Sequence, residues 1–272
     1  AHARRQHRWI RGDWQILLWL FPFVPTRHGI KRNLFPLISR WKILDNLRRS
    51  LVAPMLLAVL VAGWTILPGA HWFWTTTVLA VMASQLLPLV ARMLVGPRRA
   101  QSFAVFSRNL KADAAIALAQ VILSVTFLAY HAWDTAHAIV LTLVRMTITR
   151  RRLLEWETAA AAAARAAGIA GGRALVRFVA DMMASPIIAA VVALIVSLTH
   201  RDALSSALPF LMLWMIAPGI AYWLSKPVGP RERRLTERGQ SLLRRTARKT
   251  WRFYETFVTA ADAWLPPDNY QD

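Results

Sequence analysis

The run LVAPMLLAVLVAGWTIL, at residues 51–67, contains no charged side chain and is about long enough to cross a bilayer as a helix. Further charge-free stretches occupy residues 72–91, 114–133, 184–199 and 203–225. A crossing helix needs roughly 17–25 apolar residues, so only the stretch that begins at residue 184 is short. Together with a mean hydropathy of +0.35, this pattern predicts an all-α fold, namely a polytopic transmembrane helix bundle with amphipathic interface helices.

Positive charge is concentrated between these stretches. The chain has 34 Lys and Arg against 14 Asp and Glu, a formal net charge of +20. Of the 34 basic residues, 33 lie in four segments, at residues 1–50, 92–113, 145–183 and 225–272. Because basic segments alternate with neutral turns, as the positive-inside rule requires, we expect a multi-pass protein with both termini in the cytoplasm. A DNA-binding protein would need a basic face on a soluble fold, so we expect the lipid bilayer as partner and no nucleic acid.

The number of crossings depends on residues 135–148, an apolar segment that is short and contains Arg145. With residues 114–133 this segment forms either a tight hairpin whose second arm tilts or thins the bilayer, or two arms that lie partly in the interface. The transmembrane region, residues 51–225, is therefore predicted to hold four to six spans. Its cytoplasmic loops are placed at residues 92–113 and 149–183.

An amphipathic helix is predicted just before the first span, within residues 27–50. Pro36 opens it, and apolar side chains recur at spacings of three and four residues, at Leu37, Trp41, Leu44, Leu47 and Leu51. Such a stripe suits the cytoplasmic interface, and the span that follows directly favours that interpretation over a helix packed on a soluble core.

Residues 1–26 are predicted to form a loop and then a brief amphipathic helix over residues 12–21. They contain a basic and aromatic strip, RQHRW, at residues 5–9. A guanidinium group suits a diphosphate, because it stays charged and binds oxygens with a planar fork. An indole suits the flat face of a sugar. The alternative is an ordinary basic segment beside the membrane with an interfacial tryptophan.

Other catalytic groups are missing from the sequence. No Asp-x-Asp occurs, and Glu155 and Glu157 are two residues apart, which points them to different faces of a helix. The seven His residues show no metal-ligand spacing, and the absence of Cys excludes disulfides. We therefore expect no metal site, no bound cofactor and no catalytic residue in this chain.

The strip at residues 5–9, followed by Gly12 and Gln15, resembles the end of the catalytic domain in membrane-embedded processive glycosyltransferases of the cellulose-synthase type. In that motif the Arg contacts the nucleotide diphosphate and the Trp lines the acceptor site, which points to Arg8 and Trp9. Arg5 takes the first motif position, where Gln is commoner. The resemblance thus implies a substrate-binding site made of Arg5, Arg8 and Trp9.

Within that superfamily, several longer stretches resemble cyclic β-1,2-glucan synthases, namely residues 10–15, 39–51, 151–156, 250–255 and 264–270. This resemblance implies a very large enzyme of the bacterial inner membrane that builds β-1,2-glucan from UDP-glucose with Mg²⁺. The partners it implies are UDP-glucose, the growing glucan and the remainder of the polypeptide.

The same resemblance divides the chain into four parts. Residues 1–26 end a glycosyltransferase domain, residues 27–50 form the interface helix, residues 51–225 cross the membrane, and residues 226–272 form a cytoplasmic linker and the start of a phosphorylase-like domain. The carboxylates that bind metal and act as base would lie upstream of Ala1, so we expect this chain alone to be inactive.

A rival interpretation is a polytopic membrane anchor or transport module with no direct catalytic role. Polar residues inside spans usually mark pathways through a membrane. The candidates for such a role are few: Gln85, Gln120, Asp134 and Arg145.

The charge pattern predicts the sidedness of the turns. Reporter fusions after His71 and Asp202 should read outside, because their short turns lie between charge-free spans, whereas a fusion after Arg165 should read inside. The measurement is paired alkaline phosphatase and fluorescent-protein activity at each site. An outside signal at Arg165 would overturn the scheme.

Overall fold

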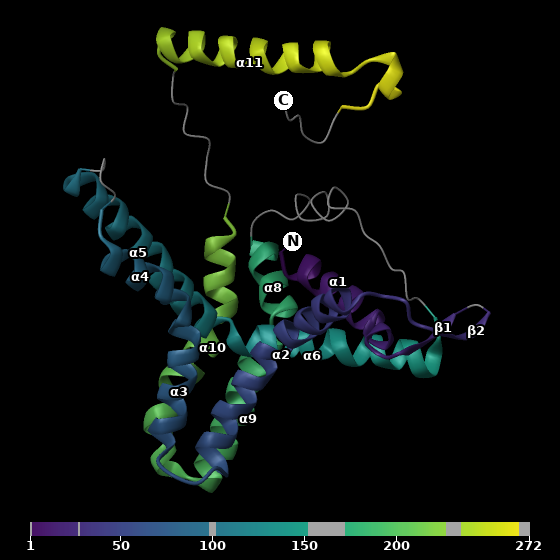
Figure 1. Cartoon of the computed structure of the whole chain (residues 1–272). Coiled ribbons are helices and arrows are strands. Elements are labelled where there is room, and N and C mark those ends of the chain that lie inside the picture. Colours follow the sequence, from purple (N-terminus) through teal and green to yellow (C-terminus); the bar gives the residue numbers. More distant parts are fainter. Residues whose placement is uncertain (1, 27, 98–101, 152–171, 227–234, 267–272) are drawn as a thin grey trace. The chain divides into compact units, whose positions relative to one another are not determined.

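The computed structural model describes every residue except 1, 27, 98–101, 152–171, 227–234 and 267–272. The chain divides into two units, Ala1–Ser225 and Lys226–Asp272, and each is described by itself. The first unit is a helix bundle with one short hairpin (Figure 1). Its elements are α1 (His2–Gln15), η1 (Leu17–Leu20), β1 (Phe23–Thr26), β2 (Gly29–Arg32), α2 (Leu37–Thr65), α3 (His71–Ala83), η2 (Ser84–Leu86), α4 (Leu87–Val95), α5 (Phe103–Thr126), α6 (Leu128–Val144), the π-helical turn η3 (Arg145–Thr149), α8 (Gly172–Asp181), α9 (Ala184–Thr199), η4 (Arg201–Ala203) and α10 (Leu204–Leu224).

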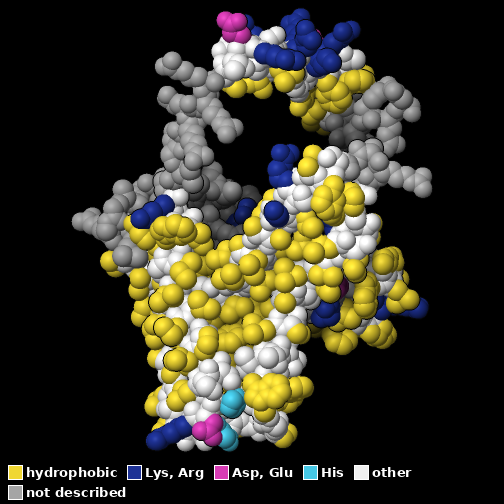
Figure 2. Space-filling model, turned by 90° about the vertical axis from the view of Figure 1, so that its left-hand side faces the viewer, with side chains coloured by type: hydrophobic (Ala, Val, Ile, Leu, Met, Phe, Trp, Pro, Cys, Tyr) yellow, Lys and Arg dark blue, Asp and Glu magenta, His cyan; other side chains and the backbone are white. Residues whose placement is uncertain are grey.

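Among the described residues, four helical stretches have the length and apolar composition to cross a membrane. They are α2, the stretch His71–Val95, α5, and the stretch Arg201–Leu224; α9 is apolar but shorter, with 16 residues. Hydrophobic side chains cover the middle of the bundle on the face seen in Figure 2, and charged side chains and histidines lie at its lower end. The predicted all-α membrane helix bundle is confirmed.

Helix α2 begins where it was predicted to begin, directly after Pro36. The interface helix and the first span, expected as two segments, are one continuous helix of 29 residues with Pro54 inside it. Proline lacks the amide N–H and cannot donate to the preceding turn, but membrane helices tolerate the lost bond where neighbouring helices support them.

The turn between α2 and α3 and the turn between α9 and α10, called the outer turns below, lie at the same end of the bundle. Helices α2 and α3 meet at the turn before His71, and α9 and α10 meet at η4; both turns lie at the lower end of Figure 1. A hydrogen bond of 2.9 Å joins Ser206 Oγ to His71 Nδ1 and links the two helix pairs. Whatever side of the membrane one turn faces, the other faces it too.

Trp214 of α10 is the centre of the packed core. Its side chain is fully buried, and its indole ring lies 6.2 Å from that of Trp64 on α2. The indole Nε1 donates to the Val125 carbonyl of α5 at 3.0 Å, and Ser185 Oγ of α9 donates to the Trp214 carbonyl at 2.8 Å. One residue therefore connects α10 to three other helices.

The span predicted at residues 114–133 is wrong in its bounds, because the helix runs from Phe103 to Thr126 and a second helix begins at Leu128. The Val125 carbonyl would normally accept from the amide four residues later, but it accepts from the Trp214 indole. Thr126 Oγ1 also donates back to the Ile122 carbonyl at 2.8 Å, a bond that often bends helices. Both bonds favour the break at this point, within an unbroken apolar run.

Helix α6 lies across the direction of α3 and α10 and packs mainly against α2 and α1 (Figure 1). The tight hairpin that was one alternative for residues 114–148 is therefore not formed along its length. The predicted loop at residues 92–113 is also largely helical where it is described, because α4 extends to Val95 and α5 starts at Phe103, with Arg92 paired to Asp113.

Other predictions fall partly or wholly outside the described residues. The cytoplasmic loop predicted at residues 149–183 is described only at its first residues and over its last part, where α8 and the residues after it lie. Glu155 and Glu157 lie outside the described part.

The second unit contains α11 (Glu237–Phe257) and η5 (Ala260–Asp262). Thr236 caps α11, since the Gly239 amide donates to its Oγ1 at 3.2 Å. No residue of α11 is buried within the unit. The assignment of residues 226–272 to a linker and a phosphorylase-like domain stays a prediction.

Substitution of Trp214 by Phe should destabilise the bundle. The change keeps an aromatic ring but removes the indole N–H that donates to the Val125 carbonyl, which we expect to cost about 1–2 kcal/mol. The measurement is equilibrium unfolding in mixed detergent micelles. Trp223→Phe on the same helix is the matched control, because Trp223 is 68% exposed. Equal effects of the two substitutions would contradict the role given to Trp214.

Candidate substrate-binding strip on the first helix

The strip RQHRW lies on a helix, not in the loop that was predicted. Helix α1 covers residues His2–Gln15, and η1 and a β-hairpin follow it. The sequence of α1 contains no proline, and its side chains at Ile10 and Trp14 are four residues apart, on the face that docks. The predicted helix over residues 12–21 is therefore wrong in its bounds, and the hairpin was not predicted.

One face of α1 is fixed to the membrane bundle by apolar packing. Ile10 is buried and clusters with Ala138 and Ile139 of α6, while Trp14 packs at the edge of the same cluster. The Trp14 indole also donates to Ser50 Oγ of α2 at 3.0 Å. Helix α1 thus rests on α6 and on the first half of α2.

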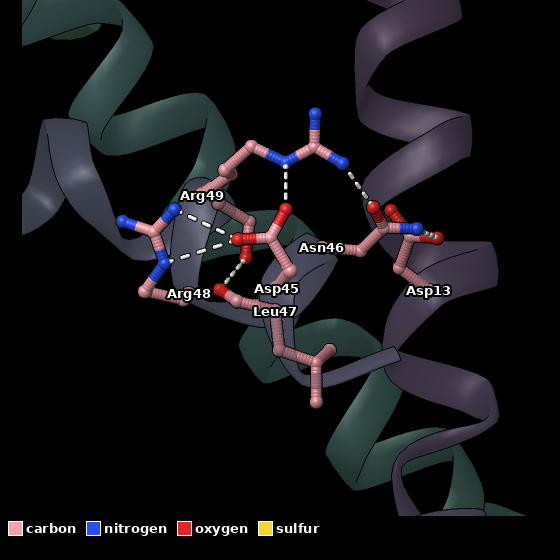
Figure 3. A network of polar contacts seen from close by, with 7 residues as sticks. Asp13, Asp45, Asn46, Leu47, Arg48 and Arg49 are labelled. Carbon is pink, nitrogen blue, oxygen red and sulfur yellow. Dashed lines mark hydrogen bonds and ion pairs between the residues drawn. The ribbon is translucent and has the colours of Figure 1, made fainter. Parts of the chain in front are cut away.

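Asn46 of α2 joins α1 to a set of charged groups on α2 (Figure 3). Its side-chain amide donates to Asp13 of α1 at 3.1 Å, and its carbonyl oxygen accepts from Arg49. Arg48 and Arg49 both pair with Asp45, at 2.8 Å and 3.2 Å. Burial raises the pKa of the Asp13 carboxyl, and the Asn46 hydrogen bond and the Arg49 charge act against that rise.

A pair of histidines completes the docking of α1. His7 Nε2 lies 3.2 Å from His137 Nδ1 of α6, and Trp133 stacks near the His137 ring. Burial lowers the pKa of His7, and the nearby His137, Arg11 and Arg145 lower it further. The neutral imidazole is therefore favoured, which suits a bond in which one ring nitrogen donates and the other accepts.

The three predicted site residues share the opposite side of α1, because Arg8 and Trp9 follow Arg5 by three and four positions. The Arg5 guanidinium lies over the Trp9 indole, 5.6 Å from the ring centroid, which is cation–π geometry. Trp9 is 62% exposed, and Arg8 is half-buried. The structure thus brings Arg5 and Trp9 into contact.

No group of three or more His, Asp or Glu side chains that could hold a metal ion occurs among the described residues. The arrangement on α1 offers cationic and aromatic surface instead. Chemically, it can bind an anion and stack on a flat ring, and it supplies no carboxylate pair for acid–base chemistry.

Sequence reasoning missed the residues that hold the strip in place. His7 and His137 are 130 positions apart, and Trp14 and Ser50 are 36 apart. No local pattern marks either pair. The spacing of Ile10 and Trp14 was the available signal that residues before Gly12 belong to a helix.

Comparison with known proteins gives a match over nearly the whole chain. The chain is 33% identical over 98% of its length to the cyclic β-(1,2)-glucan synthase NdvB of Rhizobium meliloti (strain 1021). The chain is homologous to one segment of a cyclic β-(1,2)-glucan synthase. The predicted resemblance is confirmed, and the chain spans 9% of the length of that synthase. No family model matches the chain.

This homology covers the docked helix, the hairpin and the bundle together. An exposed Arg5–Trp9 pair on a helix packed against a bundle of membrane-type helices agrees with the prediction of a membrane segment. The individual roles of Arg5, Arg8 and Trp9 stay predictions.

The histidine pair predicts a pH dependence of stability. Because the pKa of His7 is lowered in the folded chain, the unfolded chain binds more protons just below the ordinary pKa of about 6.5. Stability should therefore fall as the pH drops from about 7.5 to 5.5, and His7→Gln should reduce that fall. The measurement is the Tm in detergent micelles at both pH values.

The control is His28→Gln in the hairpin, where His28 is exposed. It should leave the pH dependence as it is in the original chain. A loss of Tm on acidification that is equal in all three proteins would contradict the assignment to His7.

Proposed function

We propose that this chain serves a longer glycosyltransferase that makes cyclic β-1,2-glucan from UDP-glucose, and that it supplies both the membrane anchor and one wall of the substrate site. The observation that carries the proposal is the exposed Arg5–Trp9 pair on a helix docked to the bundle. Homology to the glucan synthase NdvB supports the class of product.

Arg8 is assigned to the diphosphate of UDP-glucose. A guanidinium stabilises the charge that develops on a leaving diphosphate, and it does so best when the helix that carries it is already in place. The docking through Ile10, Trp14 and Asn46 holds α1 against α2 and α6, so Arg8 need not be ordered when the substrate binds.

Trp9 is assigned to the acceptor sugar. Arg5 covers one face of the indole, so the proposal leaves the other face for the acceptor, and the cation fixes the ring orientation. Arg5 is thus a positioning residue that acts through Trp9. This agrees with its place in the motif, where Gln is commoner.

Mg²⁺ and the carboxylates that hold it belong to the longer protein in this proposal, because the described residues contain no metal-binding group. We also place the protein in the bacterial inner membrane with both termini in the cytoplasm. The distribution of the 34 Lys and Arg and the common end of the two outer turns support this orientation.

Arg8→Ala in the full-length enzyme should lower glucan synthesis roughly ten- to a hundredfold, since hydrogen bonds to charged groups contribute about 1.5–3 kcal/mol. Arg8→Lys should restore only part, because lysine lacks the planar fork. Trp9→Ala should slow elongation more than UDP release, and Arg5→Ala should be milder than Arg8→Ala. The measurement is the initial rate of glucan synthesis beside UDP release in membranes with matched protein levels.

Two control variants share charge or exposure with the strip but lie outside it. Arg32→Ala removes an exposed cation from β2, and Trp41→Ala removes an indole of α2 that is 62% exposed, as Trp9 is. Parental rates in both Arg8→Ala and Trp9→Ala would show that the strip is only charge beside the membrane, and the chain would then be an anchor without a direct catalytic role.

A further inference from the structure

A pocket of about 630 Å³ opens beside the bundle; Gln6 of the docked helix lines it, whereas Arg5 and Trp9 do not. It is lined by residues of α1, α2, α3, η2, α5 and α6. The volume lies in the range of small-molecule sites. Gln85 and Gln120, the amides that stood out as unexplained polar residues within apolar stretches, are both in its wall.

The lining is polar at one end and apolar at the other. Along α2 it passes from Arg49 to Leu56 as the helix runs toward the α2–α3 turn. Along α3 and η2 it passes from Met82 to Gln85 as the chain runs away from that turn. On both helices the polar groups therefore lie on the side away from the turn.

Helix α5 repeats this gradient. Gln120 precedes Phe127, and α5 returns toward the bundle after α4 has led away from it (Figure 1). An amphiphile with its head beside Arg49, Gln85 and Gln120, and its chain toward Leu56 and Phe127, would match both ends of the pocket.

Several polar groups of the wall have no protein partner. Within the described part of the chain, no hydrogen bond involves the side chains of Gln6, Ser84, Gln120 or Ser124, and Gln85 donates to the Met82 carbonyl. Such groups are costly in a bilayer unless something satisfies them. The described lining includes Arg49 and no carboxylate, since Asp45, which pairs with Arg49, is not part of it, so the charge of the lining favours an anion.

We propose that this pocket binds one anionic phospholipid, with the phosphate head group at Arg49, Gln85 and Gln120 and an acyl chain along Leu56 and Phe127. Gln85 and Gln120 are exposed, so the pocket is open at its side and a lipid can enter from the bilayer. A sugar chain would fit less well, because aromatic stacking surface in the described wall is confined to Phe127 and His131, and the rest of the apolar lining is aliphatic.

The test uses the full 272-residue chain and measures retained lipid by native mass spectrometry after release from micelles that contain phosphatidylglycerol or phosphatidylcholine. We expect one phosphatidylglycerol per chain and weaker retention of phosphatidylcholine. Arg49→Leu should weaken retention about tenfold, and Gln120→Leu roughly three- to tenfold, from the strengths of charged and neutral hydrogen bonds.

Arg48→Leu is the matched control, because Arg48 pairs with the same Asp45 on the same helix but does not line the pocket. Gln120→Leu guards against a trivial result, since Arg49 also belongs to the network that holds α1 (Figure 3). Unchanged retention in Gln120→Leu and Arg49→Leu would overturn the proposal.

A second measurement locates the acyl chain. Phosphatidylglycerol with a diazirine in its acyl chain should crosslink to peptides that contain Leu56 or Phe127, and Gln120→Leu should reduce this yield. Crosslinks confined to other helices would overturn the proposal. So would displacement of the lipid by a soluble glucose oligosaccharide, which would identify the pocket as a sugar site.

Discussion

The rest of the bundle depends on the contacts of Trp214, whose indole is buried where four helices meet. Apolar burial does little to hold helices together in lipid, because lipid tails are as apolar as leucine side chains, so packing and hydrogen bonds between helices must do it. Trp214 supplies both, through its contact with Trp64 and its bonds to α5 and α9. The small residues Ala189, Ala207 and Ala217 are buried in the same region and let the backbones approach.

This constraint extends to the candidate site through the break in the helix after Thr126. The Val125 carbonyl accepts from Trp214 at the point where α5 ends and the chain continues as α6 in a different direction (Figure 1). Helix α1 packs against Ala138 and Ile139 of α6, and its His7 contacts His137 of the same helix. A series of contacts thus connects the helix that carries the Arg5–Trp9 pair to a hydrogen bond in the packed core.

The lipid pocket and the strip are separate parts of the same arrangement. Gln6 of α1 lies in the pocket wall, whereas Arg5 and Trp9 lie together on the helix's exposed side. A lipid in the pocket would contact the segment of α2 that carries Arg49 and Asn46; Arg49 donates to Asn46, and Asn46 donates to Asp13 of α1. The bilayer could thereby support the docking of the helix that carries the proposed substrate site.

The sequence by itself determined the helical membrane class, the start of α2 after Pro36, the spans near residues 51–67, 72–91 and 203–225, and the relationship to glucan synthases. These features depend on the length of apolar segments, on the alternation of charged and neutral segments and on local motifs, all of which are visible in the sequence alone. Only the tertiary structure decided the break near Phe127, the crosswise course of α6 and the docking of α1 on the bundle. They depend on contacts such as Trp214 with Val125 and His7 with His137, 89 and 130 positions apart, for which no local pattern exists.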